Sequence, residues 1–198
     1  MILTSGVDAD PVKLGAPMRE GLLFVHNMLV GAGLRDNVRV GVAGKIVSAF
    51  HIASVLAMGA DWANAARGFM FALGCVQSIS CDSNRCPTGI ATQDRTRQAA
   101  LVVPDKAERV YNLHRQTLRG LADMLAAAGL ELPDDLKPQH LVRRVSATEI
   151  AQFDQLHTFL KPGELIAGVG GDGFYAFSWR RASAMNFHGA AGPATRGA

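Results

Sequence analysis

Apolar residues that recur at spacings of three and four positions predict an amphipathic helix over residues 18 to 30. Glu20 lies in the predicted first turn, and Gly31 and Gly33 follow the last apolar positions, as is typical of the two ends of a helix. His26 lies within the same helix, and a packing or surface position is its simplest interpretation. The apolar face consists of Leu22, Leu23, Val25, Met28 and Leu29.

The next pattern is typical of a parallel α/β fold. Residues 38 to 44 form a nearly continuous apolar run that ends in glycine, which predicts a strand buried on both faces. Ser48 is a suitable N-cap for a helix that ends near Met58, and residues 61 to 66 predict a second short strand. A strand, a helix and a strand joined by short connections form the βαβ unit of a parallel sheet.

The second half of the chain is predicted to be mainly helical. The longest helix begins at Pro104 and ends at Gly129, because proline suits the first turn of a helix and glycine its C-terminal end. Ser146 and Glu149 have the spacing of a capping box, which predicts another short helix that ends near Leu160.

These patterns divide the chain into four segments. The first residues contain Gly and Pro without a sustained period, and the last residues are rich in Gly and Ala, so neither end is predicted to form regular structure. The four segments are an irregular lead-in, an α/β unit, a helical extension and a flexible tail, with the bounds 1–17, 18–103, 104–165 and 166–198.

Composition and charge narrow the class of protein. A length of 198 residues with 48% hydrophobic residues is sufficient for one domain with a core. The net charge is only +3, and no basic run is interleaved with aromatic residues, which argues against a nucleic-acid partner. No apolar run approaches the roughly 20 residues of a membrane span. The N-terminus also lacks the pattern of a signal peptide, so we expect a cytoplasmic protein with no membrane partner.

Two glycine-containing turns, Gly44-Lys45 and Arg67-Gly68, follow the two predicted strands. In a (β/α)₈ barrel the loops after the seventh and eighth strands commonly form a phosphate site. Glycine lets the backbone approach a phosphate closely, and Lys45 and Arg67 would add positive charge. The alternative is that both are ordinary turns of an α/β protein.

Three cysteines, Cys75, Cys81 and Cys86, have the spacing C-x5-C-x4-C. An odd number excludes a complete disulfide framework, and the spacing matches neither a zinc ribbon nor a ferredoxin run. Three thiolates would suit a three-iron cluster, whereas a zinc site would need a fourth donor such as His51 or His114. Three small buried hydrophobic residues remain the third interpretation.

Most of the chain, from about residue 16 to residue 165, resembles the FMN-binding domain of glutamate synthases. The likeness lies in the stretches MREGLLFVHNMLVGAGLRD, GKIVSAFHIASVLAMGADWANAARGFMFALGC and CDSNRCPTGIATQD. The resemblance implies an α/β fold: the last strand–helix units of a TIM-type (β/α) barrel, including an iron–sulfur loop, followed by a helical C-terminal extension. The family's barrel strands one to six are not matched, and neither are the lead-in and the stretch after Gly168.

The resemblance also implies two cofactors, FMN and a 3Fe–4S cluster. Gly44 and Lys45 correspond to the turn after strand seven, beside the FMN phosphate, and residues 67 to 69 correspond to the turn after strand eight. The implied FMN residues are Gly44, Lys45, Arg67, Gly68 and Phe69, and the implied cluster ligands are Cys75, Cys81 and Cys86. No catalytic residue is identified.

In this family the flavin reduces 2-iminoglutarate, which forms from 2-oxoglutarate and ammonia, and the cluster relays electrons to the flavin. The resemblance therefore implies an oxidoreductase that contributes to glutamate synthesis. Another chain would supply the missing barrel strands or the electrons. The alternative hypothesis is a truncated, catalytically inactive remnant or interaction module that lacks the substrate site.

Overall fold

The computed structural model describes residues 2–4, 16–168 and 173–185. Its centre is a parallel sheet with the strand order β1-β2-β3, in which Gly41 lies opposite both Ile2 and Trp62. The predicted parallel βαβ unit is therefore confirmed. The strands are β1 (Ile2–Thr4), β2 (Gly41–Ala43) and β3 (Trp62–Asn64). The structure differs from the predicted irregular lead-in at β1, because pairing with β2 is a long-range interaction that local composition does not reveal.

Helix α1 (Met18–Gly31) precedes β2, and α2 (Ala49–Ala57) connects β2 to β3. Both helices were predicted within a residue or two of these bounds. The Ser48 hydroxyl accepts a hydrogen bond from the His51 amide at 3.3 Å, which is the predicted N-cap. Gly59 ends the α2 turn with a φ of +104°, in the left-handed region that favours glycine.

One continuous apolar core lies between these helices, the sheet and a later helix. Val40 and Val42 are fully buried and come from β2 or its entry, which agrees with a central strand covered on both sides. The largest fully buried side chains are those of Leu22, Asn27, Val40, Val42, Ile46, Val55 and Met58.

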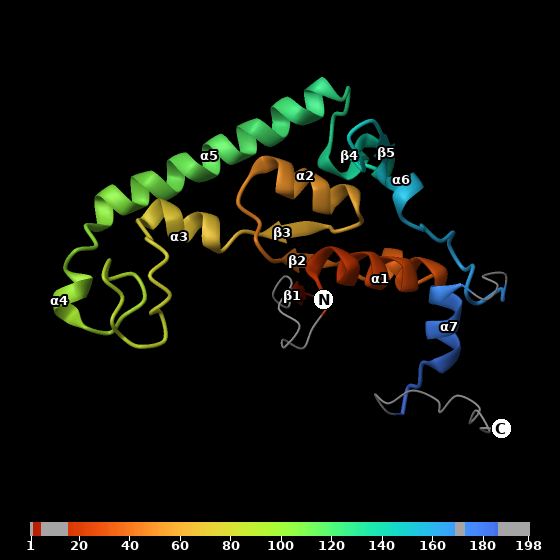
Figure 1. The fold of residues 1–198 in the computed structure, drawn as a ribbon, viewed down its shortest axis with the longest axis horizontal. Coiled ribbons are helices and arrows are strands. Elements are labelled where there is room, and N and C mark those ends of the chain that lie inside the picture. The colour runs from red at the N-terminus through yellow and green to blue at the C-terminus, as the bar shows by residue number, and fades with distance from the viewer. Residues whose placement is uncertain (1, 5–15, 169–172, 186–198) are drawn as a thin grey trace.

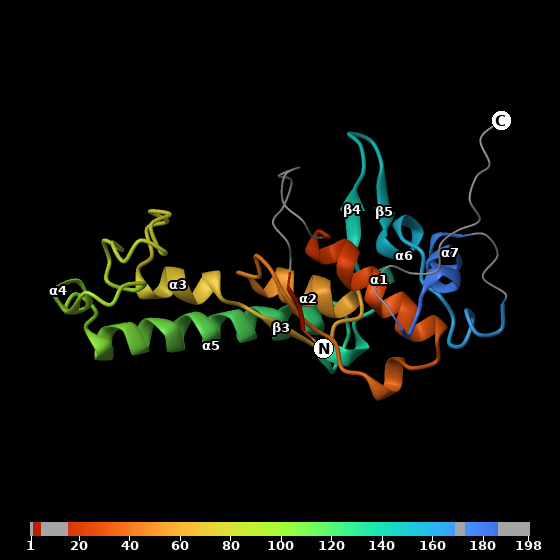
Figure 2. The ribbon, with the colours of Figure 1, turned by 90° about the horizontal axis from the view of Figure 1, so that it is seen from below.

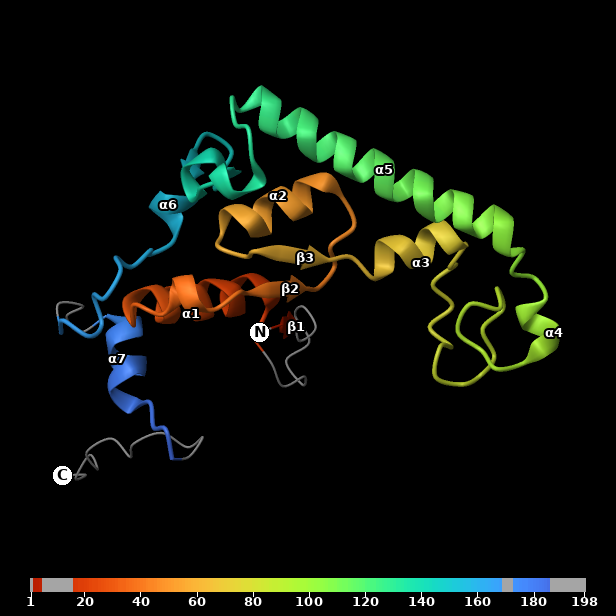
Figure 3. The same cartoon turned by 180° about the vertical axis from the view of Figure 1, so that it is seen from behind.

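After β3 the chain forms α3 (Arg67–Leu73), a cysteine-containing loop, α4 (Arg95–Gln98) and the long helix α5 (Val103–Ala127). The predicted longest helix is thus confirmed, and it contacts α3 with one half and α2 with the other (Figures 1 and 3). Leu121 and Leu125 bury their side chains in the core.

The extension differs from the predicted helix between Ser146 and residue 160. The amides of Val145 and Ser146 donate to the Glu149 carbonyl at 3.1 and 3.3 Å, and this closes a hairpin turn instead of a helix cap. Two strands pair in an antiparallel manner because β-branched residues flank this turn. The elements are η2 (Pro133–Asp135), η3 (Pro138–His140), β4 (Val142–Arg144), β5 (Ile150–Gln152) and α6 (Phe153–Leu156). Figure 2 shows the hairpin projecting beside α1.

The structure differs from the predicted flexible tail, residues 166 to 198, at α7 (Phe174–Arg181). This helix packs on α1: the Phe24 ring lies 5.7 Å from the Phe174 ring and 6.2 Å from the Tyr175 ring. Contacts with a distant helix order this segment in spite of its local composition. Residues 169–172 and 186–198 of the predicted tail lie outside the described residues.

Asn27 ties α1 to the extension. Its buried side-chain amide donates to the carbonyls of Leu23 and Thr158 at 2.9 and 3.0 Å and to the Tyr175 hydroxyl at 3.0 Å. Its oxygen accepts from the Leu160 amide at 2.7 Å. One fully buried side chain thus links α1 to residues 158–160 and to Tyr175 of the C-terminal helix.

The described residues form neither a closed barrel nor a helix that could span a membrane. The sheet has three strands and forms no closed barrel within the described ranges, so assignment to part of a TIM-type barrel stays a prediction. No helix in the part of the chain described here combines the length and apolar character needed to cross a membrane.

Replacing Asn27 with Ala should lower the free energy of unfolding by about 2 kcal/mol, because a fully buried side chain and its hydrogen bonds to the Thr158 carbonyl and the Leu160 amide are lost. Urea unfolding followed by circular dichroism measures the change. Asn112→Ala, at an exposed site of α5, is the matched control and should change stability by less than about 0.5 kcal/mol. Equal effects of the two substitutions would show that Asn27 does not anchor the extension.

Candidate functional site

The two predicted phosphate turns meet at one edge of the sheet. Because β2 and β3 are parallel, Gly44-Lys45 and the start of α3 both follow the carboxyl ends of their strands. A Cβ atom added to Gly68 would lie 3.4 Å from the Cα atom of Val47, so the turn after β3 contacts the turn after β2. The structure therefore brings together the residues predicted from separate parts of the sequence.

The conformation and charge of these turns suit an anion. Gly44 has a φ of +149° and Lys45 a φ of +51°, and the second value is uncommon for a residue with a side chain. Such strain is often found at functional sites. Lys45 and Arg67 are exposed, whereas Gly68 is buried, and Phe69 packs with its ring 5.9 Å from that of His114.

The three predicted cluster ligands lie in one loop but are not gathered around one point. Cys75 is half-buried, Cys81 is exposed and Cys86 is buried, and all three are free thiols. Among the residues that the structure describes, no group of three or more His, Cys, Asp or Glu side chains is placed to hold a metal ion. His51 and His114, the possible zinc donors, lie on α2 and α5 and join no such group either.

The loop is anchored on the side of Cys86. The Asn84 side-chain oxygen accepts from the Thr92 hydroxyl at 2.8 Å and from the Gln93 amide at 2.6 Å. Hydrogen bonding from the Thr88 side chain, 3.4 Å from Cys86 Sγ, and then from the Ala91 backbone lowers the pKa of the Cys86 thiol to about 7. A lowered pKa favours the thiolate, which is the form that binds metals.

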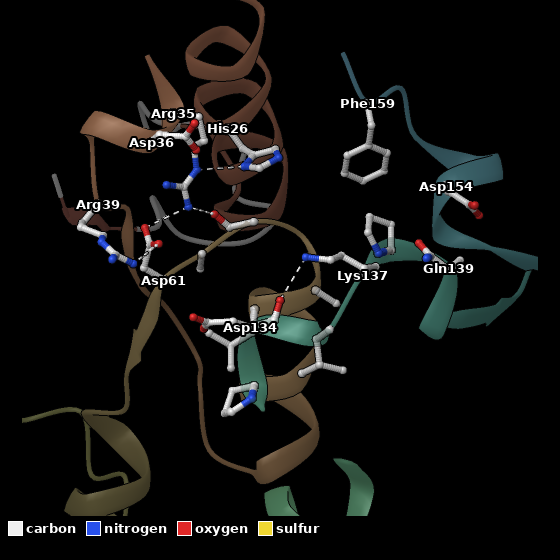
Figure 4. Close-up of a pocket in the computed structure, with 17 residues that line it drawn as sticks. His26, Arg35, Asp36, Arg39, Asp61, Asp134, Lys137, Gln139, Asp154 and Phe159 are labelled. Atoms are coloured by element: carbon white, nitrogen blue, oxygen red, sulfur yellow. Dashed lines mark hydrogen bonds and ion pairs between the residues drawn. The ribbon is translucent and has the colours of Figure 1, made fainter. Parts of the chain in front are cut away.

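A cavity of about 560 Å³ lies at the opposite, amino edge of the sheet (Figure 4). The Arg35 guanidinium fills one wall and donates to the carbonyls of Val38 and Gly59 at 2.8 and 2.9 Å and to Asp61 Oδ2 at 2.9 Å. Its Nε also donates to His26 Nδ1 at 3.3 Å. The sequence analysis identified neither Arg35 nor Asp61. Arg35 lies in the 3₁₀ turn η1 (Arg35–Asn37) and Asp61 lies directly before β3, so the two residues come together only in the folded chain.

The electrostatics of this edge favour a structural interpretation. Burial alone would raise the pKa of the Asp61 carboxyl, but hydrogen bonds from the Val40 amide and from Arg35 outweigh it and hold the pKa below its usual value. Burial, and then the charge of Arg35, lowers the pKa of His26. The imidazole is therefore neutral and accepts from Arg35, as a packing histidine does.

The free energy of unfolding should fall as the pH falls below about 6.5, because the unfolded chain then protonates His26 while the folded protein resists it. The contribution is complete above that pH and is lost toward the lower folded pKa, with a slope of at most about 1.4 kcal/mol per pH unit. Arg35, Asp61 and Lys137 are the charged groups that act on the imidazole.

Urea unfolding between pH 7.5 and about 5 measures this dependence. His26→Gln should flatten the profile in that window, and the exposed His140→Gln should leave it as in the unmodified protein. If the free energy of unfolding of both variants and of the unmodified chain depends on pH in the same way, His26 is not the source of the dependence.

Residues 9–131 match the family described as "Conserved region in glutamate synthase", which is more than half of the chain. The chain is 39% identical over 153 residues to the glutamate synthase large subunit-like protein YerD of Bacillus subtilis (strain 168), covering 77% of this chain and 29% of YerD. The chain therefore belongs to the glutamate synthase family.

Larger relatives give the same result. Identity to chloroplastic ferredoxin-dependent glutamate synthase 2 of Arabidopsis thaliana is 28% over 170 residues, which is 83% of this chain and 10% of that protein. Identity to glutamate synthase [NADH] of Saccharomyces cerevisiae (strain ATCC 204508 / S288c) is 32% over 154 residues, or 77% of this chain and 7% of the relative. The chain thus spans less than a third of each of these relatives.

Proposed function

We propose that this chain contributes to the FMN- and 3Fe–4S-dependent reductive formation of L-glutamate from 2-oxoglutarate and ammonia. The observation that carries the proposal is the contact between the turn at Gly44-Lys45 and the turn at Gly68, at the carboxyl edge of a parallel sheet in a glutamate synthase family member. Active sites of (β/α) barrels lie at this edge.

The two turns fit the phosphate group of FMN. Gly44 and Gly68 carry no side chain that would keep a phosphate from the backbone, and Lys45 and Arg67 place positive charge beside them. Phe69 lies next to Gly68 on the apolar side, where it packs against α5. FMN, when bound, supplies the reducing equivalents for the carbon–nitrogen double bond. The turns would hold its phosphate end and thereby orient the flavin.

The cysteine loop fits the cluster in chemistry but not in its present geometry. It offers three thiols, and the lowered pKa of Cys86 favours a ligand. The thiols do not converge among the described residues, so we propose that Cys75, Cys81 and Cys86 bind the cluster only after the loop closes around it. Cys75 and Cys81 would move toward Cys86, because hydrogen bonds anchor the loop on the Cys86 side.

Further strands are needed to enclose a flavin. Among the described residues β1 and β3 pair on one side only, so the sheet is open at both edges. We propose that additional parallel strands, from residues beyond those described or from another chain, complete a TIM-type barrel here. The competing interpretation, an inactive remnant or interaction module, predicts no ammonia-dependent glutamate formation even when such strands and an electron donor are supplied.

Arg67→Ala should weaken FMN binding about tenfold, because a charge-assisted contact to the phosphate is lost. Riboflavin, which has no phosphate, should bind the variant and the unmodified protein equally. Quenching of flavin fluorescence measures both affinities. Arg115→Ala, at an exposed site of α5, is the matched control. The flavin proposal fails if FMN shows no saturable binding either to the chain alone or with a segment that supplies the remaining strands.

Protein made under anaerobic conditions with intact cluster assembly should contain iron and acid-labile sulfide in the ratio of a 3Fe–4S cluster, and Cys86→Ser should abolish both. Chemical analysis and low-temperature electron paramagnetic resonance measure the content. Ser80→Ala, in the same loop, should keep the cluster. Stoichiometric zinc without iron would instead support the zinc interpretation.

A further inference from the structure

The N-terminal half of α5 carries an exposed stripe of side chains with the spacing of a helix–helix contact. This α5 stripe consists of Ala107, Tyr111, His114 and Leu118, which recur at alternating spacings of four and three positions. All four residues are exposed, and the exposed fraction is 61% for Tyr111 and 48% for Leu118. The same spacing continues to Leu121, which is buried in the core. The stripe therefore has the pattern of a contact whose first half is open to solvent.

The stripe borders an apolar cavity of about 310 Å³. His114 and Leu118 form part of its lining, together with Trp62 of β3 and Phe69 of α3. Figures 1 and 3 show α5 along one edge of the molecule, with α2 and α3 on its inner side. An aromatic side chain from a partner would therefore bury apolar surface both on the stripe and at the cavity.

Charged residues of opposite sign lie along one flank of the stripe. Glu108 and Arg115 each follow a stripe residue by one position and are two helical turns apart, so they lie on the same side. Both are exposed, and neither makes a hydrogen bond or an ion pair within the described residues. On the far side of α5, Arg109 pairs with Asp105 at 3.2 Å. The charges beside the stripe thus differ from those on the far side in having no partner in the described chain.

This flank is complementary to the same flank of a second copy. When two α5 helices pair antiparallel about a two-fold axis near residue 112, Glu108 of one copy lies opposite Arg115 of the second, and symmetry repeats the pair. The same register places Tyr111 opposite His114 of the second copy, at the apolar cavity. Parallel pairing would bring like charges to the same level, which is unfavourable.

We propose that this chain forms a two-fold symmetric dimer through the α5 stripes of two copies, with Tyr111 as the central anchor and with reciprocal ion pairs between Glu108 and Arg115. Tyrosine is a frequent anchor of protein interfaces, because its ring buries a large area while its hydroxyl reaches a polar partner or water. One helix per copy is a small interface, so the dimer is weak and depends on concentration. The interface goes beyond the proposed function, since the stripe lies outside the flavin turns and the cysteine loop.

The test is sedimentation velocity of the full chain from low to high micromolar concentration at low ionic strength. The unmodified chain should shift from monomer to dimer, and Tyr111→Ala should raise the dissociation constant at least about tenfold. Glu108→Arg and Arg115→Glu should each have a similar effect, because like charges then meet across the axis. Asp123→Arg, the matched charge reversal at an exposed site on the far side of α5, should dimerise as the unmodified chain does.

The two variants with reversed charges separate a specific interface from a loss of folding. Mixed in equal amounts, Glu108→Arg and Arg115→Glu should form a heterodimer, because the flank of one variant is then wholly basic and that of the other wholly acidic. A chain that carries both substitutions should dimerise with itself again. Misfolded variants would recover in neither case.

Several results would overturn the inference: a monomer at every concentration, equal weakening by Asp123→Arg and Glu108→Arg, or no heterodimer in the mixture. Association that survives all of these substitutions runs through another surface, such as the open edges of the sheet, and overturns it as well. If Glu108→Arg weakens instead the binding of a segment that supplies the remaining strands, the stripe belongs to that segment. The dimer then fails while the flavin proposal, which FMN titration tests separately, stands.

Discussion

The parallel register of β2 and β3 is the constraint on which the other features of this fold depend. It is set just before the strands, where the Val40 amide donates to Asp61 Oδ2 at 2.5 Å and the Asp61 amide donates to the Val40 carbonyl at 2.8 Å. Gly41 lies beside them, where a Cβ atom would come 2.3 Å from the Trp62 ring and would force that ring to move. With this register, both strands end at one edge and their turns meet.

The two edges of the sheet have opposite electrostatic character. At the amino edge Arg35 and Asp61 neutralise each other and fill their hydrogen bonds with the surrounding backbone, so this edge maintains the fold. At the carboxyl edge Lys45, Arg67 and Arg143 remain exposed to solvent. The same division between a stabilising face and a functional face is found in (β/α)₈ barrels.

The extension packs against the sheet-containing part and contacts it at two places. Asn27 joins α1 to residues 158–160 and to α7, and the hairpin carries Arg143 to the edge where β2 ends. The cysteine loop is fixed less evenly. Asn84 and Thr92 hold the side near Cys86 through their hydrogen bond, while Cys81 is exposed.

The sequence alone determined α1, α2, α5 and the βαβ unit, because periodicity and caps are local signals. It also identified the two turns of the candidate site. Only the tertiary structure decided that Ser146 and Glu149 close a hairpin, since the same spacing caps a helix unless a partner strand is present. Likewise α7 depends on contacts between segments far apart in the chain, which no local pattern encodes.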